Sequence, residues 1–465
     1  MKKILLTLVT LLVTTATFAE DRSSYYKNLP IDIPQAALPV IKAGDLNIKE
    51  YGAIGDGVYD CTRVIQTAID KVSANGGGRI VIPAGLWLTS PLSLKSGVEL
   101  HLCKNALLIL TPDRTKHFKA GQRKAMPGIY ATGCNDIAIT GHGIIDGNGE
   151  YWRAAKRSKN SDMEWNNYNA LGGIVVEKNK DQIWYPYNLK SLPNFADSYY
   201  AQESLRTSLV CIKNCQRVLI KDITLQNAPK FHLEAEDCES LTIDGILVHC
   251  PWNAQNGDGI DLKTSQKVLI ANNTIDCGDD GIVLKAATGS KAFDHKPIED
   301  VLIINNTVYH AHGGFVIGSE FSSGINRVCV KDNVFSSTDT GLRFKSFTGR
   351  GGKTSQIYIQ NILMTDIKED AVIFETDYIN EAIHKTEGAF GSDWIPEFTD
   401  IHISNVTCNA SKTGIRANGA KGTVHGIDIQ NSTFIYTGTN TEIDPDCDIN
   451  LRNVTLKSFD IHSAK

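Results

Sequence analysis

Apolar and polar residues alternate with a period of two along most of this chain. The alternation begins after Gly76-Gly77-Gly78 and is clear at 79–82 and 98–102. Such a pattern is typical of short β-strands with one buried face and one exposed face. Before the glycines, an apolar stripe at helical spacing predicts a single helix over residues 62–75.

Short apolar-x-apolar segments, most followed by Asn or Asp, recur throughout the chain. From Val218 onward they begin 23, 27, 33, 27, 29, 44 and 26 residues apart. A repeat of this length made only of strand and turn predicts an all-β fold, a parallel β-helix whose coils stack into ladders. The early helix would cap the first coil. We assign a structural role at turns to five repeating asparagines: Asn272, Asn305, Asn361, Asn405 and Asn431.

The first nineteen residues have the pattern of an export signal. Lys2 and Lys3 precede an apolar run over 4–13, and small residues follow before Glu20. This predicts a signal peptide over 1–19 and one β-helix domain over 20–465, secreted or periplasmic. The alternative is an uncleaved anchor. We expect no later membrane span.

Two intervals, 148–205 and 378–398, are too long for one plain coil. The first is rich in aromatic residues and holds a basic group, Arg153, Lys156, Arg157 and Lys159. Long loops in a compact fold are usually functional. We therefore predict that this insertion forms a wall beside a cleft, and the alternative is a surface loop packed on the side of the coils.

Charge and cysteine content exclude some classes of function. The formal net charge of −5 does not favour nucleic-acid binding, although cations gathered in a cleft still allow an acidic protein to bind an anion. The eleven cysteines show no CxxC or Cys/His ligand spacing. We expect buried free thiols, with one or two disulfides still possible, and no metal or cofactor.

Polar clusters within 256–345 suggest catalysis. Asp258 (with Asp261 nearby), Asp279 and Asp280 supply carboxylates about one coil apart. Adjacent coils would separate Asp258 from Asp279 by ~5 Å along the axis, and staggering would extend this to the ~6.5–9.5 Å of inverting glycosidases. Each motif alone is more typical of a turn, and only their order and spacing favour a site.

Two cations suggest that the substrate is an anion. Arg343 and Lys345 flank Phe344, so on a strand they point to the same side. His312-Gly313-Gly314 lies one repeat earlier, and a histidine in such a segment is otherwise more often packed than catalytic. Together these clusters predict cleavage of an anionic polymer.

The ordered motifs resemble those of the polygalacturonases, the family 28 glycoside hydrolases. The family pattern is Asn-Thr-Asp, Gly-Asp-Asp, His-Gly and Arg-Ile-Lys on a right-handed parallel β-helix. This chain has the corresponding segments 256–258, 278–280, 312–313 and 343–345. The resemblance covers nearly the whole chain after residue 20, including segments 51–57 and 83–85. Gly257 replaces Thr and Phe344 replaces Ile, which leaves the linkage and subsite preference open.

The resemblance implies a set of site residues. Those expected to be catalytic are Asp258, Asp279, Asp280 and His312, and those expected to bind substrate are Asn256, Arg343, Lys345 and Tyr378. Asp279 would be the general acid, while Asp258 and Asp280 would activate water and invert the anomeric centre. His312 would tune the proton network, and Asn256 would orient the first carboxylate. Arg343 would bind the substrate carboxylate, which Arg can do with two prongs.

The leading hypothesis is therefore a monomeric hydrolase of pectic polysaccharide or oligogalacturonide. Exo action is favoured, because the insertion over 148–205 would close one end of the groove. A pectate lyase is the alternative enzyme; it would require calcium and yield an unsaturated product. A non-catalytic polysaccharide-binding β-helix is the third possibility, although a stalk should carry its polar groups evenly along its length.

Overall fold

The computed structural model describes residues 15–16, 22–119, 124–178, 180–186, 205–378 and 394–459. The predicted signal peptide lies outside these residues, apart from strand β1 (Thr15–Ala16), which pairs with β2 (Ile41–Lys42). Within the described ranges, no helix has the length and apolar character needed to cross a bilayer.

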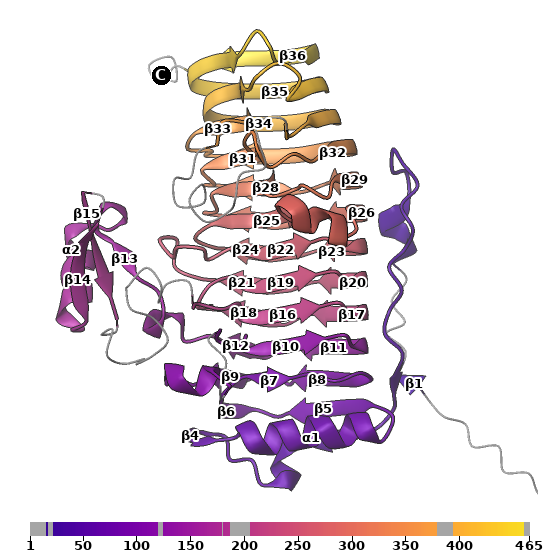
Figure 1. Ribbon diagram of the computed structural model, residues 1–465, viewed down its shortest axis with the longest axis vertical. Helices are drawn as coiled ribbons and strands as arrows, with labels where there is room; N and C mark the ends of the chain where they lie inside the picture. Colours follow the sequence, from indigo (N-terminus) through magenta and orange to yellow (C-terminus); the bar gives the residue numbers. More distant parts are fainter. Residues whose placement is uncertain are drawn as a thin grey trace, which may run out of the picture.

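The chain winds into a right-handed parallel β-helix with three sheet faces, so the predicted fold is confirmed (Figure 1). Face 1 holds β3 (Asp45–Asn47), β5 (Gly78–Ile82), β8 (Val98–Leu102), β11 (Asn135–Gly141), β17 (Gln216–Lys221), β20 (Glu239–Asp244), β23 (Gln266–Ala271), β26 (Ile298–Ile304) and β29 (Ile325–Lys331). Face 2 holds β4 (Asp56–Asp60), β6 (Gly85–Thr89), β9 (Ala106–Leu110), β12 (Ile144–Asp146), β18 (Thr224–Gln226), β21 (Leu247–His249), β24 (Thr274–Asp276), β27 (Thr307–Tyr309) and β30 (Val334–Ser336). Face 3 holds β7 (Leu92–Ser93), β10 (Ile129–Thr132), β16 (Val210–Lys213), β19 (Leu233–Glu236), β22 (Ile260–Lys263), β25 (Asp280–Lys285), β28 (Gly313–Gly318), β31 (Thr340–Lys345) and β33 (Asp370–Glu375).

The two ends of the coil differ. Helix α1 (Thr62–Ala74) covers the first coil and buries Ile65, Ala68, Ile69 and Val72, as the helical spacing predicts. At the other end, long bent strands continue the coils: β32 (Thr354–Thr365), β34 (Phe398–Asn418), β35 (Val424–Ile443) and β36 (Ile449–Ser458). Short 3-10 helices lie at Ser23–Tyr26, Ile48–Tyr51, Arg114–His117, Gly149–Tyr151, Arg157–Lys159 and Gly289–Asp294.

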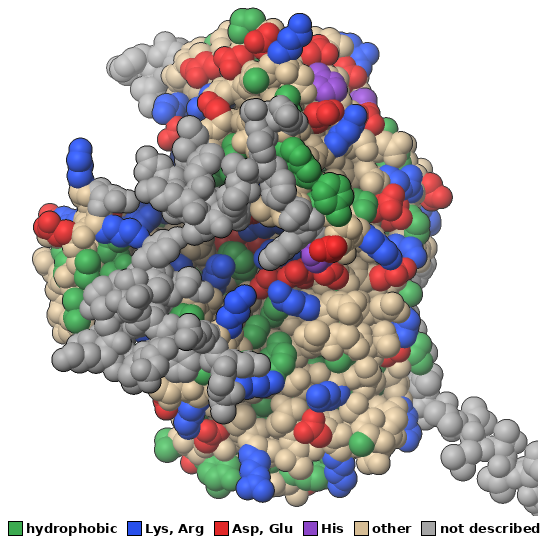
Figure 2. Space-filling view, viewed as in Figure 1, with side chains coloured by type: hydrophobic (Ala, Val, Ile, Leu, Met, Phe, Trp, Pro, Cys, Tyr) green, Lys and Arg blue, Asp and Glu red, His purple; other side chains and the backbone are tan. Residues whose placement is uncertain are grey.

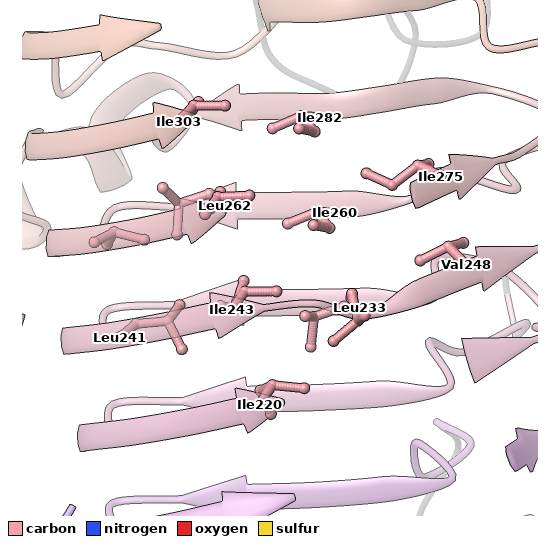
Figure 3. Packing of buried hydrophobic residues seen from close by; sticks show 14 of the residues in the cluster. Ile220, Leu233, Leu241, Ile243, Val248, Ile260, Leu262, Ile275, Ile282 and Ile303 are labelled. Carbon is pink, nitrogen blue, oxygen red and sulfur yellow. The ribbon is translucent and has the colours of Figure 1, made fainter. Parts of the chain in front are cut away.

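The core is a column of aliphatic side chains inside the coils. The register between coils places an aliphatic residue next to an aliphatic residue of the neighbouring coil: Leu233 pairs with Ile260, and Ile260 pairs with Ile282. Figure 3 shows these side chains pointing into one interior from successive rungs. Because every second residue points inward, the residues between them on face 3 point outward, where the candidate site lies.

Two asparagine ladders run along the coils. The predicted one lies on the outside: Asn305 donates to Asn272, Asn405 to Asn361, and each of these residues has a positive φ that favours asparagine. The second ladder, which the sequence did not reveal, is buried one residue further on. There the Asn273 amide donates to Asn306 at 2.8 Å, and Asn306 donates to Asn333 at 2.9 Å.

Replacing Asn306 by Ala should destabilise the fold by roughly 2–5 kcal/mol, because it orphans buried groups in two coils. The Asn306 side chain accepts from the backbone N–H of Asn273 at 3.0 Å and donates to the carbonyls of Ile270 and Ile304. Denaturant unfolding measures the loss. Asn305→Gly, one position earlier, keeps the positive φ accessible and should cost less than about 1 kcal/mol, and equal losses in the two variants would contradict the assignment.

The segment before the first coil runs along the outside of face 1 (Figure 1). Tyr25, Tyr26 and Ile33 pack on outward apolar residues of β23 and β26, such as Leu269 and Leu302. This segment therefore covers an apolar strip of the sheet.

The insertion over 148–205 folds, in its described part, into a small module beside the coils (Figure 1). It contains α2 (Asp162–Ala170) and an antiparallel sheet of β13 (Ala155–Lys156), β14 (Ile174–Lys178) and β15 (Asp181–Tyr185). Residue 179 and residues 187–204 lie outside the described part, as do residues 379–393 of the second predicted insertion.

All eleven cysteines are free thiols, and all except Cys103 are buried. The prediction of buried free thiols is confirmed, and the disulfides that the sequence left possible are not formed in this structure.

Candidate active site

The register of the coils brings the predicted acids together. Ile260 pairs with Ile282, so two residues earlier Asp258 lies beside Asp280 on neighbouring coils. Asp280 in turn pairs with Gly313, which places Asp279 beside His312. All four residues lie where the chain turns from face 2 onto face 3, so residues 54 positions apart share one edge of that face.

Two lysines compensate two of the acids. Lys285 Nζ lies 3.2 Å from Asp258 Oδ2 and 2.5 Å from Asp261 Oδ1. Lys345 Nζ lies 2.7 Å from Asp280 Oδ2. Asp261 is fully buried and paired to Lys285, which gives it a structural place behind the site.

Asp279 is held by different groups. His312 Nδ1 lies 3.0 Å from Asp279 Oδ1, and the backbone N–H of Asn256 donates to Asp279 Oδ2 at 3.1 Å. The side-chain oxygen of Asn256 accepts from Arg206 at 2.9 Å. The contact that we expected between Asn256 and Asp258 is thus replaced by contacts with Asp279 and Arg206.

One oxygen on each of the two stacked acids has no protein partner. Asp258 Oδ1 and Asp280 Oδ1 are both buried and, among the described residues, neither accepts a hydrogen bond. Their Oδ2 atoms are the ones that Lys285 and Lys345 hold. The two free oxygens are therefore fixed in place and keep unused capacity to accept a hydrogen bond.

The three carboxyl groups form one cluster. One oxygen of each of Asp258, Asp279 and Asp280 lies within 4.8 Å of the other two. The expected ~6.5–9.5 Å describes the separation of whole carboxyl groups, so it stays a prediction beside this nearest approach of single oxygens. Register aligns Asp258 with Asp280, one position beyond Asp279.

The cations lie two coils further along face 3. Lys345 pairs in register with Gly318, and Arg343 with Val316, so both side chains point outward as alternation predicts. Both lie 5.5 Å from the ring centre of Tyr378. Arg343 also has Glu375 at 3.8 Å. The arrangement offers a guanidinium and an ammonium beside an aromatic ring.

Both departures from the family motifs have a packing reason. A Cβ at Gly257 would lie 2.9 Å from Cys250 Sγ and 3.1 Å from the carbonyl oxygen of Ala254, so this turn has no room for Thr. Phe344 points inward and stacks on Phe374 with ring centres 4.4 Å apart. Phe344 packs in the core beneath β31, the strand that carries Arg343 and Lys345.

All eight predicted site residues line one cavity of 550 Å³. Figure 2 shows acidic and basic side chains gathered in a hollow at mid-height of the molecule. The cavity also contains residues that the sequence reasoning missed or placed only generally: Lys156, Lys159, Lys230, Lys285 and Glu320. A larger hollow of 640 Å³ lies against the insertion module but contains none of the clustered acids.

Lys156 and Lys159 show that the insertion borders the cleft. Both come from the basic group that the sequence placed in the wall, and Lys159 Nζ lies 3.2 Å from His312 Nε2. Lys285 has a weaker sequence signal, because an outward lysine on a strand resembles any surface lysine. Only register shows that it reaches Asp258.

Electrostatics distinguish Asp258 from Asp279. Burial, with the negative charge of Asp261 beside it, raises the pKa of Asp258 well above its ordinary value despite Lys285. Burial would also raise the pKa of Asp279, but the hydrogen bond from His312, with Lys345 and Lys285 nearby, lowers it overall. These opposite directions favour a proton on Asp258 over one on Asp279.

The acids are close enough to hold a metal ion. Lys285, Lys345 and His312 already contact Asp258, Asp280 and Asp279 respectively. A divalent cation would have to displace or oppose these groups, so the donor set does not fit a dedicated metal centre.

A parallel β-helix with clustered carboxylates, an imidazole and cations in one groove defines a carbohydrate-active enzyme of the glycosidase class. Comparison with known families identifies which. The model of "Glycosyl hydrolases family 28" matches residues 196–450, and "Rhamnogalacturonase A/epimerase, pectate lyase-like" matches residues 46–101. The chain belongs to glycosyl hydrolase family 28 and is a polygalacturonase-like glycoside hydrolase.

Similar proteins include both modes of chain cleavage. The chain is 31% identical to an exo-poly-alpha-D-galacturonosidase of Dickeya chrysanthemi, over 91% of this chain and 71% of that one. It is 26% identical to an endo-polygalacturonase of Pectobacterium carotovorum subsp. carotovorum, over 85% and 87%. Among solved structures, an exopolygalacturonase from Thermotoga maritima has a TM-score of 0.70 at 24% identity, covering 90% of this chain and 94% of that one. This last likeness shows the fold.

Proposed function

We propose that this protein is an exported hydrolase that removes galacturonate units from pectic polysaccharide by inversion at the anomeric carbon. The observation that carries the proposal is the pair of fixed, unpartnered oxygens on Asp258 and Asp280. Together they accept both hydrogens of one water molecule, which positions it for attack and removes its proton. Asp279, beside them, donates a proton to the leaving oxygen.

This division of roles requires a proton to move when substrate binds. In the free site the raised pKa of Asp258 and the lowered pKa of Asp279 favour a proton on Asp258. A substrate carboxylate on Arg343 and Lys345 neutralises part of the positive field that stabilises ionised Asp279. The proton then passes within the carboxyl cluster, which leaves Asp279 as the acid and Asp258 as a base.

Lys159 also reaches the acid through His312. Its Nζ lies 3.2 Å from His312 Nε2, and the other ring nitrogen of His312, Nδ1, lies 3.0 Å from Asp279 Oδ1. The imidazole therefore connects a cation of the insertion module to Asp279.

Exo action is supported by the insertion. Lys156 and Lys159 bring the module to the edge of the cleft, where it limits how far a polymer can extend. The exo-poly-alpha-D-galacturonosidase of Dickeya chrysanthemi is the relative with 31% identity. Export is supported by the signal pattern over residues 1–19.

The decisive experiment incubates the enzyme with polygalacturonate and defined oligogalacturonides in the presence of a chelator. We expect reducing ends, release of short products from one chain end, and no absorbance of an unsaturated product. NMR of the first product should show the inverted anomer. Mid-chain cleavage would contradict exo action, a retained anomer would contradict the proposed water attack, and an unsaturated product would contradict hydrolysis.

The pH dependence of kcat/KM should be bell-shaped. Activity requires one proton in the cluster, so it falls as pH rises through the raised pKa of Asp258, which lies above the ordinary ~3.9 of Asp. Activity also falls at acid pH, where Asp279, with its lowered pKa, takes up a second proton. Initial rates between about pH 3 and pH 9 test the alkaline limb, because the acid limb lies below the ordinary ~3.9 of Asp. A high-pH limb at or below ~3.9 would contradict the proton assignment.

A further inference from the structure

Lys230 lies on the opposite side of the acids from Arg343 and Lys345. Leu233 pairs with Ile260, so Lys230 falls in the same row as Gly257 and, one coil further, Asp279. Along the axis the order is Lys230, then the acids, then the cations of β31. Positive groups therefore flank the acids on both sides, about two coils away in each direction.

Lys230 differs from its basic neighbours because it has no acidic partner. Lys263 lies 2.8 Å from Glu234, and Lys285 contacts Asp258 and Asp261. Among the described residues, no carboxylate lies within ion-pair distance of Lys230, whose Nζ sits 4.3 Å from the ring centre of Phe231. A π-face does not satisfy the hydrogens of an ammonium group, so Lys230 keeps its capacity to donate to an anion.

The surroundings of Lys230 form a hollow of 300 Å³ that continues the catalytic cavity. The two hollows share Lys230, Phe231, Lys285 and Glu320. Burial, with the charges of Lys263 and Arg206 nearby, lowers the pKa of Lys230, and the more distant charge of Glu234 offsets this only in part. An anion that bound here would lower the cost of keeping this ammonium half-buried.

We propose that Lys230 binds the carboxylate of a second galacturonate, on the opposite side of the scissile bond from the sugar held by Arg343 and Lys345. This inference rests on the proposed function and adds a residue, Lys230, that would distinguish a free carboxylate from its methyl ester on that sugar. A methyl ester removes the charge that Lys230 pairs with and leaves the ammonium buried beside a neutral group. Pectin methylated on that sugar is therefore a poor substrate.

The test compares Lys230→Met, Lys230→Arg and a control, Lys267→Met, which removes a surface lysine paired with Glu239. Each enzyme is assayed on unesterified trigalacturonate and on its fully methyl-esterified counterpart. For Lys230→Met we expect kcat/KM on the unesterified substrate to fall on the order of ten- to a hundred-fold, the value of a charged hydrogen bond. On the esterified substrate, Lys230→Met should lower kcat/KM only slightly relative to wild type. The ratio of kcat/KM between the unesterified and the esterified substrate should therefore become smaller. Lys230→Arg should keep most of the discrimination, and Lys267→Met should match the wild type.

Binding of trigalacturonate by calorimetry, in an Asp279→Asn background, separates the two proposals. If the wild type cleaves trigalacturonate but Lys230→Met leaves kcat/KM, affinity and discrimination unchanged, the subsite is wrong and the function stands. If the wild type neither cleaves nor binds it, the proposed function fails, and the subsite fails with it. A melting temperature for Lys230→Met that equals that of the wild type shows that a loss arises in the cleft.

Discussion

Replacing Asp279 by Asn should reduce kcat by about 10²- to 10⁴-fold, the contribution of a positioned general acid. The amide keeps the shape of the side chain but has no proton to give to the leaving oxygen. Folding should be spared, because the change removes one of three crowded negative charges and keeps an acceptor for the N–H of Asn256. Rates on polygalacturonate and thermal melting measure the two effects.

A substrate with an acidic leaving group distinguishes acid catalysis from simple loss of structure. A nitrophenyl galacturonide needs little protonation to leave, so Asp279→Asn should impair its cleavage far less than that of the polymer. Asp276→Asn, three residues earlier on face 2, should leave both rates unchanged. Equal losses on the two substrates, or more than a tenth of wild-type activity on the polymer, would exclude Asp279 as the acid.

Replacing Lys285 by Met should destabilise the protein by about 3–5 kcal/mol near neutral pH, since it strips a buried ammonium from two buried carboxylates. Lys285 contacts both Asp258 and Asp261, and burial already raises the pKa of each. Without Lys285 the folded-state pKa values rise further above those of the unfolded chain. The folded protein then binds more protons, so its stability falls as pH rises through this range.

The loss should therefore depend on pH with a defined sign. At a pH below ~3.9, the ordinary pKa of Asp, Asp258 and Asp261 are protonated in both the folded and the unfolded chain. The stability difference between Lys285→Met and the wild type is then smallest. It grows as pH increases towards the folded-state values. Denaturant unfolding across this range measures it, with Lys267→Met as the exposed control, expected within ~0.5 kcal/mol of wild type. A loss that is constant with pH would show that Lys285 acts through packing alone.

The cleft concentrates positive charge in a protein whose formal net charge is −5. Among the residues that the structure describes, six cationic side chains line the catalytic cavity: Lys156, Lys159, Lys230, Lys285, Arg343 and Lys345. Four described carboxylates line it: Asp258, Asp279, Asp280 and Glu320. Such a local excess attracts a polyanion into the groove, where low-dielectric walls strengthen each contact.

The β-helix, its capping helix and the inward apolar column followed from the sequence, because they depend on local periodicity that each coil repeats. The outer asparagine ladder followed for the same reason. The inner ladder of Asn273, Asn306 and Asn333 was not recognised, since a second Asn at a turn looks redundant until the coils are stacked.

Seven of the eight site residues came from the order of the polar clusters, Tyr378 came from the family resemblance, and all eight line one cavity. What the sequence by itself determined is which residue types recur at coil spacing. Tertiary structure alone decided the register, which pairs Asp258 with Asp280 and Asp279 with His312 and brings the carboxyls within 4.8 Å. It also decided the charges around them, because Lys285, Lys159 and Lys230 come from separate coils and from an insertion. Register between coils is set by long-range packing, which no local pattern encodes.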